Sequence, residues 1–201
     1  NDSGLVVSLT FGGRKVVGDG FGIHLILRYV LETSSTTEQA VLKLKNTPAH
    51  MAYNVTVLDE DGFAETVYMR PDKPVKSQRL QYATNHQDED PWIQYTEATK
   101  SYDRERELLY CLSNRDLQAC DLVEKFLQKP FFAKKYQRGF GTLYTCVYWP
   151  LRKQVEYFWP TKSVRLTLGK VVEQSINVKY YQKKARPKSV SELVPHIPLD
   201  A

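Results

Sequence analysis

The feature that most constrains the fold is the stretch "MAYNVTVLDEDGFAETVYMRP" at 51–71, in which Asp61-Gly62 joins two alternating runs. Apolar and polar residues alternate on both sides, which is the two-residue period of a strand with one buried face. Asp-Gly tolerates the positive φ that a tight hairpin turn requires. The run "VKSQRLQYATNH" at 75–86 predicts a further strand. The centre of the chain is therefore predicted to be a three-stranded meander.

The chain opens with another β-rich run, "GLVVSLTFGG" at 4–13, which Gly12-Gly13 closes. The residues "RKVVG" at 14–18 follow at once. A strand, a glycine turn and a second apolar run are typical of a hairpin, so we predict that a hairpin begins the chain.

Two helices are predicted before the meander. The run from Ile23 to Leu31 is apolar except for His24 and Arg28, which suits a largely buried helix. In the next segment Ser35 and Glu38 have the spacing of a capping box, in which the hydroxyl and the carboxylate each satisfy a free backbone NH. The apolar face of this second helix comprises Ala40, Val41 and Leu44.

Helices follow the meander, and strands follow these helices. "SYDRERELLYCL" (101–112) and "DLQACDLVEKFLQ" (116–128) have helical patterns, the latter with Ala119, Leu122, Val123 and Phe126 on one face and Pro130 as its stop. "TLYTCVYWPLRKQVEYFWP" (142–160) predicts strands around a turn at "PLRKQ". The fold class is therefore α+β with mainly antiparallel sheets, in one domain over 1–168 and a basic, proline-containing tail over 169–201.

Composition excludes several classes of protein but selects no partner. The 201 residues, 42% of them hydrophobic, can bury a sizeable core, and the net charge of +5 mixes 28 bases with 23 acids. Three cysteines and no CxxC or HExxH pair argue against a zinc site and favour a reducing, cytoplasmic compartment. No phosphate-binding glycine loop and no apolar run long enough for a membrane span is present, and we expect no cofactor.

The polar residues that remain as candidates are Asn1, Asn85 and Arg104. An Asn side chain is a neutral, fixed donor that can stabilise a developing oxyanion. Each residue also has a structural alternative: a frayed terminus for Asn1, a turn hydrogen bond for Asn85, and a surface helix position with Glu107 at i+3 for Arg104. His86 is expected to orient the loop after Asn85 rather than act as a general base.

Four segments, taken in order, resemble one family. "NDSGL" is similar to the "NE-x-GL" strand of the choloylglycine hydrolase and penicillin acylase relatives, "YATNH" to their "TN" strand end, and "SYDRERELL" to their Ser-x-x-Arg helix start. The hairpin "TLYTCVYWPLRKQVEYFWP" resembles the "T-x-Y-x-x-x-Y-x-P" hairpin of the acyl-coenzyme A:6-aminopenicillanic acid acyltransferase branch. The resemblance covers about residues 1 to 168.

The resemblance implies an N-terminal nucleophile enzyme with a four-layer αββα sandwich, here incomplete at its N-terminus. In such enzymes a processed N-terminal cysteine attacks a linear amide or a thioester. Asn1 and Asn85 would correspond to the two asparagines near the oxyanion, and Arg104 to the arginine near the nucleophile. The sequence departs from the family because Cys111, Cys120 and Cys146 are all internal, so the nucleophile is expected upstream of Asn1.

The leading hypothesis is therefore the C-terminal part of a cysteine amide hydrolase or acyltransferase. Its expected partners are a small amide or acyl-thioester substrate and the missing N-terminal segment, and a second copy of the chain is a further candidate. The alternative is a noncatalytic binding or assembly module that contacts nucleic acid or protein through its tail. The segment from Lys170 to Lys188 in this tail contains six Lys or Arg residues and one acidic residue, Glu173. The spread of thirteen tyrosines over most strands argues against the nucleic-acid version. A third option, a reactive Cys111 or Cys146, conflicts with their apolar surroundings.

Overall fold

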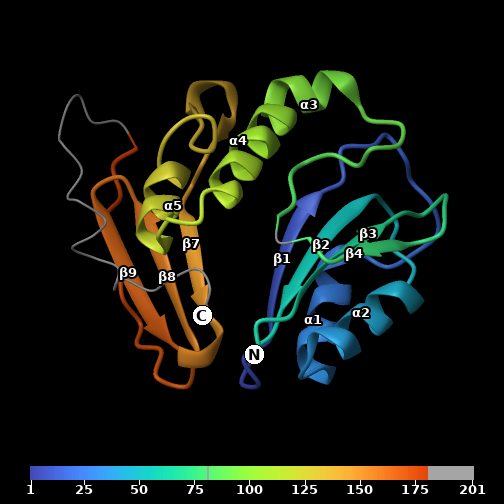
Figure 1. The fold of residues 1–201 in the computed structure, drawn as a ribbon, viewed down its shortest axis with the longest axis horizontal. Coiled ribbons are helices and arrows are strands. Elements are labelled where there is room, and N and C mark those ends of the chain that lie inside the picture. The colour runs from blue at the N-terminus through green and yellow to red at the C-terminus, as the bar shows by residue number, and fades with distance from the viewer. Residues whose placement is uncertain (81, 181–201) are drawn as a thin grey trace. The chain divides into compact units, whose positions relative to one another are not determined.

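The computed structural model describes residues 1–80 and 82–180, which form two compact units. The first unit comprises residues 1–105 together with 150–153, and the second comprises 106–149 and the residues from 154 onward. Figure 1 labels most of the helices and strands of both units. The division falls inside helix α4 (Ser101–Ser113), whose first turn belongs to the first unit.

The first unit is built on a four-stranded antiparallel sheet with the order β1-β2-β3-β4. Its strands are β1 (Val6–Phe11), β2 (Tyr53–Leu58), β3 (Ala64–Met69) and the short β4 (Lys76–Gln78). Gly62, at φ 84°, provides the positive φ of the predicted turn between β2 and β3. The three-stranded meander is thereby confirmed, although its last strand is only three residues long.

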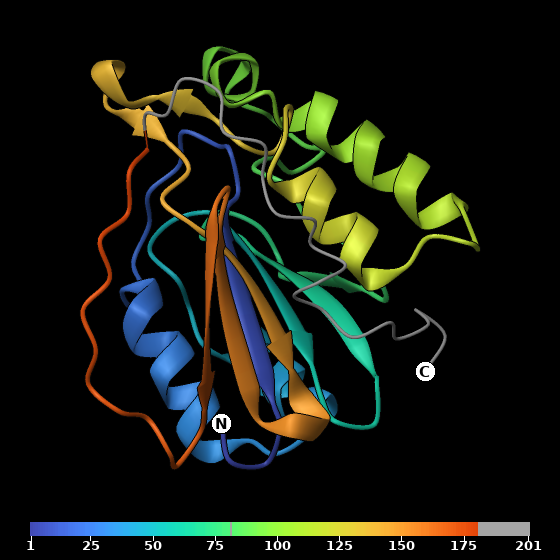
Figure 2. The same cartoon turned by 90° about the vertical axis from the view of Figure 1, so that its left-hand side faces the viewer.

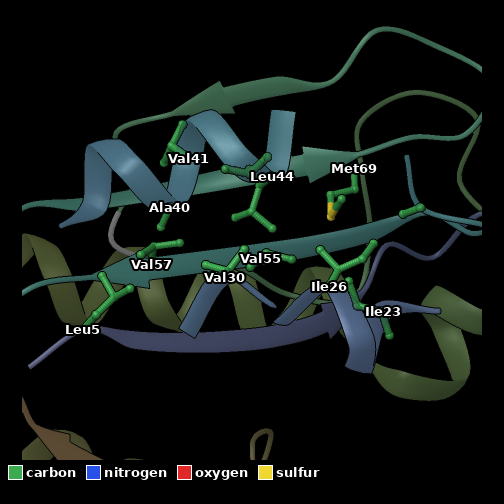
Figure 3. Packing of buried hydrophobic residues seen from close by; sticks show 12 residues of the cluster. Leu5, Ile23, Ile26, Val30, Ala40, Val41, Leu44, Val55, Val57 and Met69 are labelled. Carbon is green, nitrogen blue, oxygen red and sulfur yellow. The ribbon is translucent and has the colours of Figure 1, made fainter. Parts of the chain in front are cut away.

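Helices α1 (Ile23–Thr33) and α2 (Thr37–Asn46) pack on one face of this sheet. Figure 3 shows how α1 and α2 direct apolar side chains at β2 and β3. Register places the partners Leu9, Val55 and Val67 side by side in successive strands, so the alternation seen in the sequence becomes one continuous apolar layer. The core contains the following buried residues: Leu5, Ile23, Ile26, Val30, Ala40, Val41, Leu44, Ala49, Val55, Val57, Val67 and Met69.

Three local predictions for this unit are wrong. Residues 14–18 form no strand with β1, which pairs instead with β2; only an isolated bridge joins Val17 to Met51. The predicted capping box is displaced by one residue, because Thr36 is the N-cap and its side chain accepts from the NH of Gln39. The Gln39 carboxamide in turn accepts from the NH of Ser35. Helix α1 is also less buried than predicted, since Leu25 and Tyr29 are exposed.

The described residues of the segment that follows β4 and leads into the helices are not paired with any strand. The predicted strand over 75–86 is right only for β4, and residues 82–87 lie outside any ladder. The short helix α3 (Ile93–Thr99) precedes α4 and was not predicted. Lys100, in the left-handed conformation, ends α3, and Ser101 begins α4 directly afterwards.

The second unit is a three-stranded antiparallel sheet with the order β7-β8-β9 and a helix packed on it. Its strands are β7 (Thr145–Trp149), β8 (Gln154–Trp159) and β9 (Lys162–Thr167), which form the orange sheet in Figure 2. Helix α5 (Ala119–Phe126) contributes Cys120 and Val123 to a small core around Phe158. A ribbon of β5 (Lys134–Lys135) and β6 (Phe140–Gly141) precedes the sheet.

The chain is thus a mixed structure of helices and antiparallel sheets, as the α+β prediction requires. Within the described residues, no helix has the length and apolar character needed to span a bilayer. Of the predicted tail over 169–201, residues 181–201 lie outside the part of the chain that the structure describes.

Candidate active site

Side chains from the sheet, rather than a strand ladder, hold the segment that carries Asn85. The buried Asn54 on β2 donates from Nδ2 to the carbonyls of Thr84 and His86, at 2.8 Å each. Its Oδ1 accepts from Nε2 of Gln87 at 3.0 Å, so every polar atom of this amide has a partner. Thr10 on β1 donates a further hydrogen bond to the Thr84 carbonyl. The backbone of Thr84 to Gln87 is therefore fixed on the sheet face opposite α1 and α2.

Gly13 allows this segment to approach the end of β1 closely. Gly13 has φ 66°, and a Cβ built on it would lie 2.4 Å from the carbonyl oxygen of Asn85 and 2.9 Å from the Cα of His86. Any larger residue would displace the backbone that carries Asn85. The glycine pair that predicts a hairpin turn in the sequence is thus a point of close backbone contact.

Asn85 and Arg104 are brought together although 19 residues separate them. Nη2 of Arg104, in the first turn of α4, donates to Oδ1 of Asn85 at 2.8 Å. On its other side the amide donates from Nδ2 to the hydroxyl oxygen of Tyr95 in α3, at 3.4 Å. The guanidinium is donor-only, so it fixes the orientation of the amide: the oxygen faces Arg104 and the NH2 group is turned away from it.

Arg104 carries a charge that no acidic side chain offsets within the described residues. Burial lowers its pKa, the nearby Tyr95 being the smaller, opposing influence, and its Nε is buried without a hydrogen-bond partner. Glu107, the acid at i+3 that the structural alternative invoked, binds Lys125 at 3.0 Å instead. A partly buried guanidinium without a carboxylate partner favours binding of an anion or a developing negative charge.

His86 braces the segment from the opposite side, as the sequence predicts. Its Nδ1 lies 2.8 Å from Oγ of Ser101 and 3.1 Å from Oγ1 of Thr84, and its Nε2 lies 3.3 Å from Oε2 of Glu105. The ring also packs on Tyr102 at 4.2 Å between centroids. The order hydroxyl, imidazole, carboxylate is that of a hydrolase triad, but Ser101 is 0% exposed and no substrate can reach it. These contacts instead attach the start of α4 to the residue after Asn85.

Comparison with known proteins identifies the family. The model of the family described as acyl-coenzyme A:6-aminopenicillanic acid acyl-transferase matches residues 1–163 of the chain. The chain belongs to this acyl-transferase family. No curated protein and no solved structure matches it. The resemblance that the four sequence motifs indicate is therefore confirmed.

Within this acyl-transferase family member, the structure does not bring Asn1 to Asn85 and Arg104. Asn1 precedes β1, whose six residues span roughly 20 Å, whereas Asn85 lies against Gly13 beyond the other end of that strand. Nδ2 of Asn1 donates to the carbonyls of Leu31 and Ser34, at 2.8 Å each. Its Oδ1 accepts from the NH groups of Ser3 and Leu5. Both amide protons of Asn1 are thus engaged at the end of α1. Of the three residues predicted to converge, the structure brings together Asn85 and Arg104 only.

Asn1 therefore has a structural role that can be measured. We expect Asn1→Ala to lower the free energy of unfolding by about 1–3 kcal/mol, because the last carbonyls of α1 lose their cap and two NH groups lose an acceptor. Urea unfolding measures this change, with Asp2→Ala as a control that removes an exposed side chain. A variant as stable as the parent chain would contradict the role.

The three cysteines of this family member are poor nucleophiles. Burial raises the pKa of the thiols of Cys111, Cys120 and Cys146, which keeps them protonated at neutral pH. Cys111 and Cys120 are also fully buried. No group of three or more His, Cys, Asp or Glu side chains suited to a metal occurs among the described residues.

Sequence reasoning did not identify the residues that position the pair. Asn54 has the appearance of an ordinary polar position in an alternating strand, and Tyr95 lies in a helix of seven residues, too short for a periodic signal. A polar Asn in the middle of an apolar meander was the available signal, because a buried amide requires partners.

Proposed function

We propose that this chain supplies the oxyanion-binding part of a cysteine N-terminal nucleophile enzyme, an amide hydrolase or acyltransferase. Its substrate would be a linear amide or a thioester. The nucleophilic cysteine would lie in residues that precede Asn1 in the complete protein. Family membership supports the reaction class, and the four-layer αββα sandwich of such enzymes is part of the same proposal.

The contact between Arg104 and Asn85 is the observation that carries this proposal. A guanidinium without an acidic partner is held against the oxygen of a carboxamide, and the NH2 group of that carboxamide is thereby directed away from the charge. Such an amide is a preorganised donor for an oxygen that becomes negative in the transition state. The positive charge of Arg104 polarises the amide, which makes its N–H groups stronger donors.

The reaction would proceed through an acyl-enzyme. The thiolate attacks the substrate carbonyl carbon, a C–S bond forms, and the carbonyl oxygen becomes an oxyanion that accepts from Nδ2 of Asn85. Collapse of this intermediate breaks the bond to the amine or thiol, which leaves with a proton that the nucleophile has given up. Water or an acyl acceptor then attacks the enzyme thioester and releases the thiolate. Asn85 would donate in both steps, and Arg104 is its positioning residue.

Trapping of the acyl-enzyme tests this function. Hexanoyl-N-acetylcysteamine, a simple acyl thioester, is mixed with the complete protein after any processing, and the digest is examined by mass spectrometry. We expect one hexanoyl group on a cysteine in the segment preceding Asn1, at the N-terminus of its chain. An adduct on Cys111, Cys120 or Cys146, or the absence of a cysteine before Asn1, would overturn the proposal. Iodoacetamide pretreatment is the control, since it should block the adduct.

A further inference from the structure

Among the residues that the structure describes, the hydroxyl group of Tyr95 has a single polar partner. Its oxygen accepts from Nδ2 of Asn85 at 3.4 Å, a distance beyond the ordinary range for such hydrogen bonds. An amide NH2 group can only donate, so the phenolic hydrogen must point elsewhere. No acceptor for that hydrogen is found among the residues that the structure describes. Tyr95 therefore has a donor that no described protein group accepts, directly beside the proposed oxyanion-binding amide.

Aromatic contacts fix the position of this hydroxyl. The ring of Tyr95 stacks on Trp92, with centroids 5.5 Å apart and planes at 26°, and meets the ring of Phe11 edge to face at 5.1 Å. Trp92 is itself attached to the end of β1, because its NH donates to the carbonyl of Gly13. The Tyr95 ring is thus held between α3 and the sheet, and its hydroxyl is preorganised with respect to Asn85.

Burial also keeps the hydroxyl protonated. It raises the pKa of Tyr95, and this effect exceeds the opposing influence of Arg104 and of the hydrogen bond from Asn85. At neutral pH the group is a neutral phenol that can donate. Arg104 contacts Oδ1 of Asn85, on the other side of the amide, so it occupies neither the NH2 group nor the phenol.

We propose that Tyr95 is a second hydrogen-bond donor to the carbonyl oxygen of the substrate, alongside Nδ2 of Asn85. The inference rests on the function proposed above and adds a catalytic residue to it. Two donor atoms 3.4 Å apart can both lie within the 2.7–3.1 Å of one oxygen that such sites require. The long contact between them is weak, so exchanging it for two contacts with a developing oxyanion is favourable. The phenolic proton stays on Tyr95 throughout.

The variant Tyr95→Phe in the complete protein tests this role because it removes the hydroxyl and retains the stacked ring. We expect kcat/KM for an acyl thioester to fall roughly ten- to a hundred-fold, mainly through kcat, with the urea midpoint unchanged. Tyr29→Phe is the matched control, because Tyr29 is exposed on α1 and its ring hydroxyl is outside the site. A Tyr95→Phe enzyme with unchanged kcat would overturn the inference.

A second readout reports the hydrogen bond itself. Hexanoyl-N-acetylcysteamine with a 13C-labelled carbonyl is bound to protein whose nucleophile has been replaced by alanine, and the carbonyl stretch is measured by infrared spectroscopy. Loss of the Tyr95 donor should move the bound carbonyl band to higher frequency by several wavenumbers. An unmoved band would overturn the inference even if Tyr95→Phe had altered folding.

The two proposals fail in different ways. If Asn85→Ala abolishes activity while Tyr95→Phe has no effect, the function stands and the role of Tyr95 is wrong. If neither substitution alters kcat, Asn85 and Tyr95 do not bind the oxyanion, and the proposed function is contradicted as well. Loss of activity in both, with a shifted carbonyl band in each, is the expected result.

Discussion

Replacing Asn85 with alanine in the complete protein is expected to lower kcat/KM by about 10²- to 10³-fold. The substitution removes a donor that Arg104 orients at 2.8 Å and leaves the backbone of the segment bound to the sheet by Asn54. Because oxyanion stabilisation acts in the transition state, the loss should appear in kcat rather than in KM. Steady-state kinetics with an acyl thioester measures it.

The stability of the same variant distinguishes catalysis from structure. The Asn85 side chain hydrogen-bonds Arg104 and Tyr95, and it is only partly buried, so the urea midpoint should change little. Asn46→Ala, an exposed amide at the end of α2, is the matched control for both measurements. Equal losses of stability and activity in Asn85→Ala would support the structural alternative, in which this amide only fixes its own turn.

Much of the fold follows from local patterns in the sequence. The alternation around Asp61-Gly62 is sufficient for β2 and β3 because their pairing is local, with a turn that demands a particular backbone conformation. The predicted hairpin at Gly12-Gly13 failed for the complementary reason. Strand β1 pairs with a strand more than forty residues away, and no local pattern specifies such a partner.

The candidate site could be predicted in residue types but not in geometry. The motifs point to Asn85 and Arg104, and the structure places these two side chains in contact. They also suggest Asn1, yet the side chain of Asn1 donates its hydrogen bonds to carbonyls at the end of α1. The motifs could not predict this, because it depends on the end of α1 lying next to Asn1 in space. Tyr95 is absent from every motif, because its relevance depends on a ring position that Phe11 and Trp92 set.

Charged groups at the other end of the Asn85 segment have a large predicted effect on stability. Arg14 follows Gly13, is 3% exposed, and donates from Nη1 and Nη2 to the two carboxylate oxygens of Asp72, at 2.8 and 2.7 Å. Asp90 lies farther away at 3.4 Å. We expect Asp72→Asn to lower the free energy of unfolding by about 3 kcal/mol at pH 7, because it leaves a buried guanidinium without its main counter-charge.

The loss of free energy of unfolding in Asp72→Asn should become smaller as the pH falls. Hydrogen bonds from Arg14 hold the pKa of Asp72 below its usual value of 3.8, with burial as a smaller opposing influence. A carboxylate with a lowered pKa in the folded state stabilises the fold fully above its unfolded pKa, and the contribution is lost as the pH falls through the folded pKa. The difference in the free energy of unfolding between the parent chain and Asp72→Asn is the gap to be measured by urea unfolding at pH 7 and near pH 3. This gap should therefore be smaller near pH 3 than at pH 7. Asp19→Asn, which alters an exposed carboxylate, should show no gap at either pH. A gap that persists unchanged in acid would mean that the shape of Asp72, and not its charge, holds Arg14 beside Gly13.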